Sequence, residues 1–289
     1  MEKLLHNIAA IFFITCCINC SVIAQPYIDV VNIHYCKSPD IGLSQHNRKA
    51  TDLNYFNVST TLPVLFNNKK DAIIFSPYYE QWEAKIRGVN SFRKNHFGIV
   101  LPVSFLKSID SKWSILVTPI IRINDTAFDA KSKWQFGGAV VGSHKSLDGK
   151  FTYKFGIYVN GDLFGLFVMP LLGIDWQINS KTNLFGLLPG NLMLERQLIK
   201  SLYYGAAFRA FTNSYTDLNH YWRVDENQAG IFADWYVSKK IVFNIEAGHS
   251  VFRKIRTGTK NKARTDWQAN DNLYLKFGLA FRIRFNREN

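Results

Sequence analysis

Residues 273–285 read LYLKFGLAFRIRF and alternate between two kinds of side chain. The odd-numbered positions hold Leu, Phe or Ile, whereas the even-numbered positions hold Tyr, Lys, Gly, Ala or Arg. Successive side chains of a β-strand point to opposite faces, so this period of two predicts a strand with one apolar and one polar face. The apolar face of such a strand contacts lipid in a transmembrane barrel, but packs on a second sheet in a soluble sandwich.

The same alternation recurs earlier in the chain, for example in residues 113–124, 151–160 and 241–248. Short polar turns are predicted at 67–71, 107–112, 146–150, 179–181, 199–200 and 238–240. Between them lie longer connections at 84–94, 125–132, 213–226 and 253–271, and two brief ones at 161–162 and 189–190. Alternating short and long connections are typical of an up-and-down antiparallel β-barrel. We predict an all-β transmembrane barrel of about 14 strands starting near Tyr27, with 12 as the second choice.

Five prolines fall within these expected strands. Proline cannot donate a ladder hydrogen bond, so it is expected at bulges or strand ends. The residues concerned are Pro63, Pro77, Pro102, Pro119 and Pro170.

The composition agrees with a membrane barrel. Aromatic residues make up 15% of the 289 residues, and hydrophobic residues 47%, at a mean hydropathy of -0.09. A barrel requires an apolar exterior, aromatic girdles and a polar interior, and this balance provides all three. The net charge of +13 comes from Lys and Arg spread through turns and alternate strand positions, without a basic helix. We therefore predict no nucleic-acid partner.

The first 24 residues have the pattern of a secretory signal peptide. Lys3 precedes an apolar core from Ile8 to Ile18, and small residues stand near Ala24. The core is about eleven residues long, short of the ~20 that a membrane-spanning helix needs. We predict cleavage before Gln25, export by the general secretory route and a mature barrel domain over residues 25–289. The alternatives are a membrane anchor and a lipoprotein modified at Cys20.

The last strand also resembles the assembly signal of bacterial outer-membrane barrels. That signal places a polar residue, a glycine and alternate hydrophobic residues before a final Phe. The matching positions are Lys276, Gly278, Phe281, Ile283 and Phe285. Residues 286–289 follow the Phe, whereas many such barrels end on it. The resemblance implies insertion by the barrel-assembly machinery and a location in the outer membrane of a Gram-negative bacterium.

Residues 173–179, 184–189 and 203–209 make the chain similar to a family of uncharacterised outer-membrane barrels of Bacteroidota, known as a domain of unknown function. The resemblance implies the fold and the location. It implies no activity and no catalytic residues.

No residue pattern indicates an enzyme, a cofactor or a metal site. His249 and Ser250 are adjacent, so in a strand they point to opposite faces and cannot form a nucleophile–base pair. The same objection holds for His144 beside Ser143. No pair of histidines has the spacing of a zinc site. Carboxylates in predicted loops are a weak candidate for a divalent cation: Asp125, Asp129, Asp217, Asp225 and Glu226. The single mature cysteine, Cys36, is expected to be a bystander.

The charged residues of the predicted inward faces are the candidate functional residues. They are Arg122, Lys154, Asp175, Arg209, Asp234, Glu246, Lys276, Arg282 and Arg284, joined by Glu80. Basic residues are in excess, and basic rings favour anions in a pore. Alternatively, the charges pair across the lumen and block it. Barrels of about 14 strands lie between filled small barrels and open large ones, so strand number does not decide.

We therefore expect a porin-like passive channel for small polar or anionic solutes. The alternative from another class is a non-conducting structural or surface-interaction barrel. In it, the basic segment Arg253 to Asp271 contacts lipopolysaccharide phosphates. A lipid-modifying outer-membrane enzyme is the third choice. Expected partners are outer-membrane lipids and lipopolysaccharide.

Overall fold

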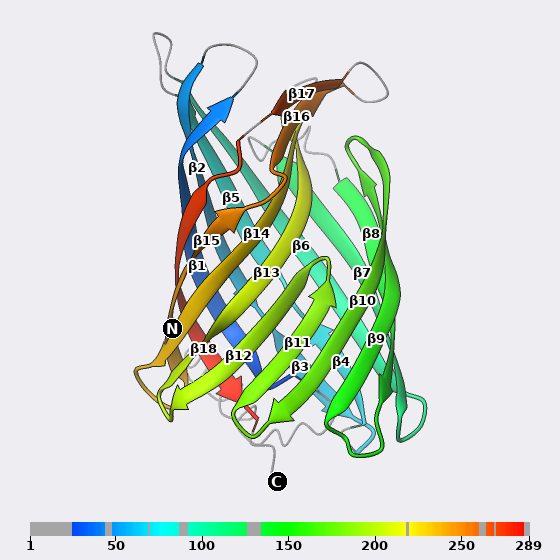
Figure 1. Cartoon of the computed structure of the whole chain (residues 1–289). Helices are drawn as coiled ribbons and strands as arrows, with labels where there is room; N and C mark the ends of the chain where they lie inside the picture. Colours follow the sequence, from blue (N-terminus) through cyan, green and yellow to red (C-terminus); the bar gives the residue numbers. More distant parts are fainter. Residues whose placement is uncertain are drawn as a thin grey trace, which may run out of the picture.

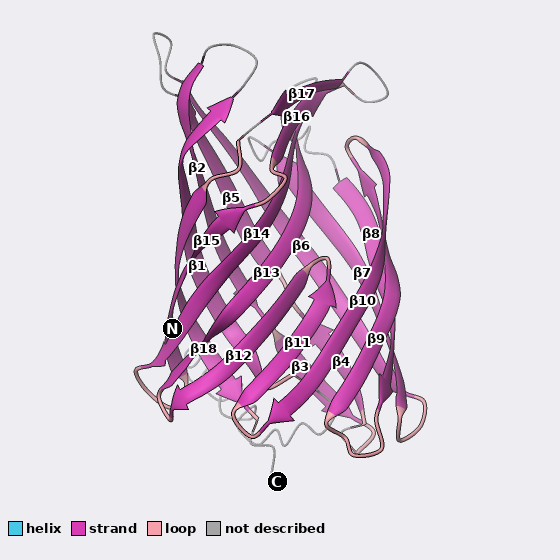
Figure 2. Ribbon diagram, viewed as in Figure 1, coloured by secondary structure: helices cyan, strands magenta, loops and turns pink. Residues whose placement is uncertain are grey.

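The computed structural model describes residues 25–43, 48–68, 70–86, 92–125, 134–217, 220–259, 264–268 and 270–285. The predicted signal peptide (1–24) and residues 286–289 lie outside this described part. Every regular element described is a β-strand (Figure 2). The strands are β1 (Tyr27–Leu43), β2 (Arg48–Thr60), β3 (Leu62–Phe66), β4 (Asp71–Phe75), β5 (Tyr78–Ile86), β6 (Phe92–Ser108), β7 (Trp113–Asp125), β8 (Trp134–Lys145), β9 (Phe151–Asp162), β10 (Gly165–Asn179), β11 (Thr182–Leu188), β12 (Asn191–Ile199), β13 (Leu202–Asp217), β14 (His220–Tyr236), β15 (Ile241–Ser250), β16 (Lys254–Gly258), β17 (Arg264–Gln268) and β18 (Leu273–Arg284). Within the described ranges, no helix has the length and apolar character needed to cross a bilayer.

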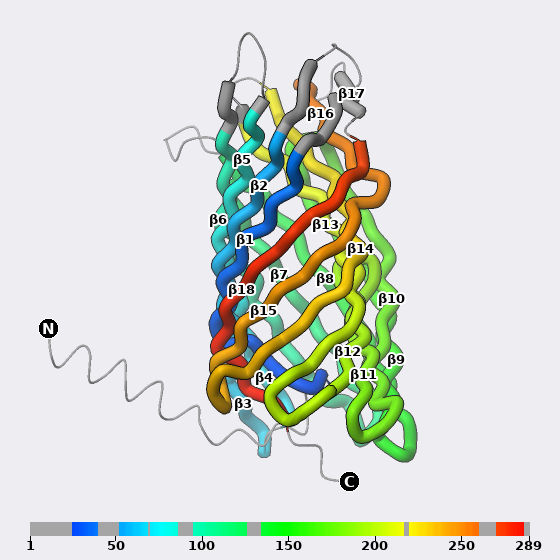
Figure 3. The backbone as a smooth tube through the Cα atoms, turned by 60° about the vertical axis from the view of Figure 1, so that its left-hand side comes forward, coloured from blue at the N-terminus to red at the C-terminus, as the bar shows by residue number. Residues whose placement is uncertain are grey.

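The strands form one antiparallel sheet that closes on itself (Figure 1). Most strands pair with their sequence neighbours, but β2 pairs with β5 and β15 pairs with β18, past the short segments between them. Closure comes from β1, which pairs with both β2 and β18. Four short segments, β3, β4, β16 and β17, lie in line with longer strands, so the wall is a closed barrel of 14 strands. The predicted up-and-down barrel and its leading strand count are confirmed. The chain winds around the barrel in sequence order, and β18 returns beside β1 (Figure 3).

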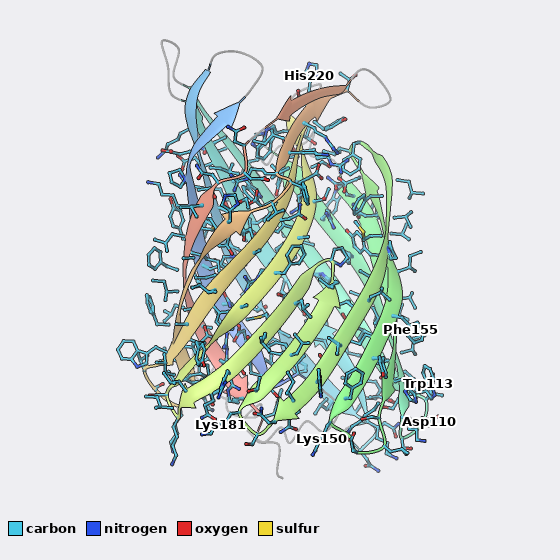
Figure 4. The ribbon with its side chains drawn as sticks, in the orientation of Figure 1. Asp110, Trp113, Lys150, Phe155, Lys181 and His220 are labelled. Atoms are coloured by element: carbon cyan, nitrogen blue, oxygen red, sulfur yellow. The ribbon has the colours of Figure 1, made fainter. Side chains whose placement is uncertain are left out.

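The outer surface of the barrel is apolar. Along β18, Phe277 and Leu279 are 40% and 50% exposed, whereas Lys276 and Ala280 on the other face of the strand are 7% and 4% exposed. Side chains such as Trp113 and Phe155 project outward from the wall in Figure 4. A soluble sandwich would bury this apolar row against a second sheet. The barrel instead leaves it on the outside, which is the arrangement of a transmembrane barrel.

The six short turns predicted from the sequence all lie at one end of the barrel, the lower end of Figure 1. Lys150 and Lys181 mark two of them, and His220 marks the opposite end (Figure 4). One predicted long connection, residues 213–226, is wrong. β13 and β14 pair without interruption up to Asp217 and His220, so most of this segment is strand. The predicted connection 253–271 also contains a hairpin, β16–β17.

The prolines divide into two groups. Pro63, Pro77 and Pro102 lie around one irregularity in the sheet. At this point β2 ends and β3 begins, and β4 ends and β5 begins. Ser76 N donates a hydrogen bond to Pro102 O at the same place. The expectation of bulges or strand ends is correct for these three. Pro119 and Pro170 lie inside strands, and each has a ladder partner on one side, Gly138 and Ile157. On the other side, the β6–β7 pairing skips Pro119, and β10 pairs with β11 only from Leu172. Both prolines therefore lie where one of the two ladders is missing.

The hairpin β11–β12 is shorter than its neighbours. β10 pairs with β11 only from Leu172 downward, and β13 pairs with β12 only up to Arg209. The upper part of β13 therefore has no wall partner on that side among the described strands. It leans across the interior instead: the Ser214 carbonyl accepts hydrogen bonds from Asn124 of β7 and Gln135 of β8. This upper β13–β14 hairpin, residues 210–226, is called the inner hairpin below.

Candidate functional site

The structure buries or partly buries all nine charged residues predicted to face inward. Six are at most 7% exposed: Arg122, Asp175, Asp234, Glu246, Lys276 and Arg282. The side chains of Lys154, Arg209 and Arg284 are 16%, 23% and 19% exposed. These residues come from seven strands around the barrel. Because each occupies an inward-facing position of its strand, their side chains all lie in the interior of the barrel.

At the lower end, a ladder of arginines and carboxylates lines the interior. Arg282 Nε is 2.5 Å from Asp29 Oδ1, and Arg282 Nη1 is 2.5 Å from Asp234 Oδ2. The Arg282 guanidinium also lies over the Tyr27 ring, 3.6 Å from its centroid. Next to it, Arg284 forms a two-point pair with Glu195, at 3.0 and 2.5 Å. Two-point arginine–carboxylate pairs are directional as well as strong, so this ladder fixes its side chains in place.

Halfway along the interior, one carboxylate serves two cations. Glu246 Oε1 is 2.5 Å from Arg209 Nη1, and Glu246 Oε2 is 2.7 Å from Lys276 Nζ. Tyr274 donates its hydroxyl to the same carboxylate at 2.7 Å. On another part of the wall, Lys154 Nζ is 2.6 Å from Asp175 Oδ2. Hydrogen bonds of this kind offset much of the cost of removing these charges from water.

Near the upper end, Glu226 accepts hydrogen bonds from Arg253 at 2.5 and 2.8 Å and from Ser250 at 2.6 Å. Arg253 also donates to Ser38 at 2.9 Å. Glu226 was expected in a loop, as a possible cation ligand. It is instead 1% exposed and paired inside the barrel.

The inner hairpin brings a second carboxylate, Glu80 of β5, into contact with β13. Asn213 Nδ2 and the Tyr215 hydroxyl each donate to Glu80 at 2.7 Å, and the Tyr55 hydroxyl donates at 3.0 Å. Arg122 of β7 donates to Asn213 at 3.2 Å. The hairpin is therefore tied to β5 and β7, which lie on either side of β6.

Aromatic side chains fill the space around the inner hairpin. Trp222 stacks on His96 with ring centroids 4.2 Å apart. Both belong to a packed region with Leu53, Trp82, Ala84, Tyr215, Val224 and Ile255. Sequence patterns alone do not place these residues together in the interior. For Tyr215 and Trp222 the available signal is the density of Tyr, Trp and His between residues 211 and 224, which also resembles an exposed loop.

The lower interior holds a cavity of about 290 Å³. Its polar lining includes Asn32, His34, Asn191, Asn244 and Thr61, and its charged lining includes Asp29, Arg209, Asp234, Lys276 and Arg282. The apolar lining comes from Tyr27, Phe185 and Met193. This cavity approaches the volume of small-molecule binding pockets.

The remaining candidates have structural explanations. His249 lies on the outer face, whereas Ser250 is fully buried and bonded to Glu226, so the two side chains diverge. Asp225 lies between Arg223 and Arg256, at 2.8 and 3.0 Å. Asp125 is buried, Asp129 lies outside the described residues, and the side chain of Asp217 is not described. In the described ranges, no group of three His, Cys, Asp or Glu side chains is placed to hold a metal ion.

At the lower turns, outside the apolar belt, Asp71 is held by three donors. Lys107 Nζ lies 2.7 Å away, the Ser108 backbone N–H donates at 3.0 Å, and Asn67 donates at 2.9 Å. These hydrogen bonds favour the charged form and lower the pKa of Asp71 from 3.8 to about 2. The turn between β3 and β4 is therefore stabilised by a carboxylate that is ionised at neutral pH.

The closed sheet, the apolar outer surface and the charged interior together define a transmembrane β-barrel. The chain belongs to the family described as "Domain of unknown function (DUF6268)", whose match covers residues 25–286. No curated protein matches the sequence.

Solved structures that are similar to the chain include channels and a porin, at low sequence identity. An outer membrane channel from Pseudomonas putida F1 is 9% identical, with 90% of this chain and 98% of that chain covered and a TM-score of 0.42. A mutant of the TodX monoaromatic hydrocarbon channel is 8% identical, with 89% and 90% covered and a TM-score of 0.43. The NanC porin is 9% identical, with 86% and 98% covered and a TM-score of 0.36.

Proposed function

We propose that the protein is a porin-like barrel of the Gram-negative outer membrane that admits small polar or anionic solutes to its interior. The observation that carries the proposal is the cavity of about 290 Å³, whose charged lining consists of Arg209, Lys276, Arg282, Asp29 and Asp234. A barrel that served only as a membrane anchor would gain nothing from placing such costly charges around a space large enough for a solute.

In our proposal, the position of the inner hairpin corresponds to a closed state of the channel. The inner hairpin contacts β5, β7 and β8 through Glu80, Asn124 and Gln135, and aromatic rings fill the space beside it. Conduction in our proposal requires the inner hairpin to move away from these strands. The inner hairpin has no ladder with β12 beyond Arg209, but its β14 arm pairs with β16 from Tyr221 to Asp225. The proposed movement therefore carries the short β16–β17 hairpin with it and leaves the longer wall strands paired.

A non-conducting barrel is the second candidate, and the paired charges favour it. Each of the nine predicted inward charges has an ion pair or a hydrogen bond in the interior, for example Lys154 with Asp175. In this alternative the pairs serve only to fill the barrel.

Planar-bilayer recording of the refolded protein separates the two candidates. The channel proposal predicts discrete conductance steps, with larger steps when the inner hairpin is loosened. A silent protein, both as wild type and with a loosened hairpin, would leave the non-conducting barrel as the function. The control is a matched amount of detergent without protein.

The cellular setting belongs to the same proposal. Residues 1–24 act as a signal peptide for the general secretory route, and Lys276, Gly278, Phe281, Ile283 and Phe285 act as the signal for the barrel-assembly machinery. Lipopolysaccharide and outer-membrane lipids contact the outer surface, and the source is a member of the Bacteroidota. The two-residue period of β18 supports the assembly role, because its outward row is apolar throughout. The proposal assigns no catalytic residue.

A further inference from the structure

The charges around the lower cavity are arranged as two poles of opposite sign. The first pole contains Arg209 and Lys276, which share the single carboxylate of Glu246. The Tyr274 hydroxyl also donates to that carboxylate, so its acceptor positions are already occupied. Two cations facing one carboxylate leave one positive charge uncompensated on this side of the cavity.

The second pole has the opposite composition. Asp29 and Asp234 share the single guanidinium of Arg282. Asn32 donates to Asp29 at 3.1 Å, and Asn244 donates to Asp234 at 2.5 Å, but neither amide carries a charge. One negative charge is therefore uncompensated on this side.

The two poles line one cavity, so one small molecule can face both. Asp234 pairs in register with Asn244, and Asn244 pairs with Gly278, two interstrand steps of ~4.8 Å each. Lys276 is two residues from Gly278 on the same face of β18, a further ~7 Å along the strand, and the long side chains reach inward from these backbone positions. The cavity between the poles has a partly apolar floor, formed by Tyr27, Phe185 and Met193.

We infer that the lower cavity is a binding site for a small zwitterion, whose carboxylate faces Arg209 and Lys276 and whose ammonium faces Asp29 and Asp234. A simple anion or cation satisfies one pole and meets the other with like charge, whereas a zwitterion satisfies both. The inference deepens the proposed function, because the site lies inside the proposed channel and specifies the class of solute.

Three probes of matched size test the inference: 4-aminobutyrate, butyrate and n-butylammonium. They share a chain of similar length and differ in which charged ends they carry. Calorimetric titration of the detergent-solubilised protein at pH 7 is expected to show 4-aminobutyrate binding about tenfold more tightly than either singly charged probe. Equal affinities for the three probes, or no binding of any, overturn the inference.

Two variants locate the site. Arg209→Gln is expected to weaken 4-aminobutyrate binding about tenfold and to remove the advantage over n-butylammonium. Asp234→Asn is expected to weaken it similarly and to remove the advantage over butyrate. Both variants leave the neighbouring charges paired, since Glu246 keeps Lys276 and Arg282 keeps Asp29.

Lys154→Gln is the matched control, because Lys154 is an inward ion-paired cation that does not line the cavity. If it weakens binding as much as Arg209→Gln does, the inference is overturned. The same samples separate this inference from the proposed function. Selective binding without conductance supports the site and contradicts the channel. Conductance without any preference among the three probes supports the channel and contradicts the site.

Discussion

Single residues in this barrel carry charge at low cost because their partners are built into the wall. Glu246 is fully buried, yet it accepts hydrogen bonds from Arg209, Lys276 and Tyr274. An isolated buried carboxylate would cost several kcal/mol, and such a set of donors offsets that cost. The same principle applies to Asp71 at the lower turns, where the effect on titration can be measured.

We predict that Asp71→Asn destabilises the barrel at neutral pH but not in strong acid. The pKa of Asp71 is lowered to about 2 by its donors, below its ordinary value of 3.8. A depressed pKa stabilises the folded state above the ordinary value, and this contribution is lost as the pH falls toward about 2. Urea unfolding of both proteins across the pH range is the measurement.

The difference in unfolding free energy between wild type and Asp71→Asn is expected to be constant above about pH 5 and to vanish near pH 2. Lys107→Gln serves as the companion variant. It removes the hydrogen bond that lowers the pKa of Asp71 most, so this pKa is expected to move back toward 3.8. The stabilisation by Asp71 is then lost over a narrower range of pH. Parallel pH profiles for wild type and Asp71→Asn contradict the prediction.

The sequence could predict which charged residues face inward, but not their partners. The period of two places Lys276, Arg282 and Arg284 on one face of β18, and the structure buries that face. Arg282 bonds to Asp29 of β1 and to Asp234 of β14, 253 and 48 positions away. A local period contains no information about which inward residues meet across a closed barrel.

At the scale of elements, the inner hairpin is the feature that sequence patterns misassign. Its tip reads TNSYTDLNHYW, with Asn, Ser, Thr and Asp in abundance, and such clusters usually mark a loop. Here Asn213 donates to Glu80 of β5, the Ser214 hydroxyl donates to Asp162 of β9, and the Ser214 carbonyl accepts from Asn124 of β7. The composition of this segment resembles that of a loop because its polar side chains face the polar interior of the barrel.

We predict that Trp222→Ala enlarges the conductance and weakens the barrel. Trp222 stacks on His96 and is 5% exposed, so its removal opens space beside the inner hairpin. A buried Trp→Ala substitution costs about 3–5 kcal/mol of unfolding free energy. Single-channel recording should show larger steps than wild type.

Trp235→Ala is the matched control for Trp222→Ala. Trp235 is on the same strand, β14, but it is 55% exposed on the outer surface. It is expected to leave the conductance unchanged. Equal step sizes for wild type and Trp222→Ala would show that the aromatic region does not limit passage.

At the scale of the whole molecule, the apolar outer surface determines the environment in which the barrel is stable. The exposed apolar rows run along strands from all sides of the wall, for example Phe243 on β15, Leu275 on β18 and Val140 on β8. An apolar surface of this extent requires contact with lipid or detergent.

We predict that Phe277→Arg impairs insertion. Phe277 lies near the middle of β18 and is 40% exposed on the outer face. An Arg at the bilayer midplane costs ~2–4 kcal/mol in a membrane barrel. Refolding into liposomes, followed by heat-modifiable mobility on gels, should show a lower folded fraction than wild type.

Leu147→Arg is the control for this prediction. Leu147 is 88% exposed in the turn between β8 and β9, outside the apolar belt, so a charge there is expected to be tolerated. Similar losses for the two substitutions would argue against an apolar exterior that faces lipid.

The junction between the first and last strands has a consequence for the timing of folding. Tyr27 pairs with Arg284, and Asp29 lies opposite Arg282 with an ion pair between them. None of these contacts can form until residues at the very end of the barrel domain have been synthesised. A chain that stops before β18 is left with two open sheet edges and with Asp29 lacking its cation. The Asp29–Arg282 pair thus distinguishes a finished cylinder from an incomplete one.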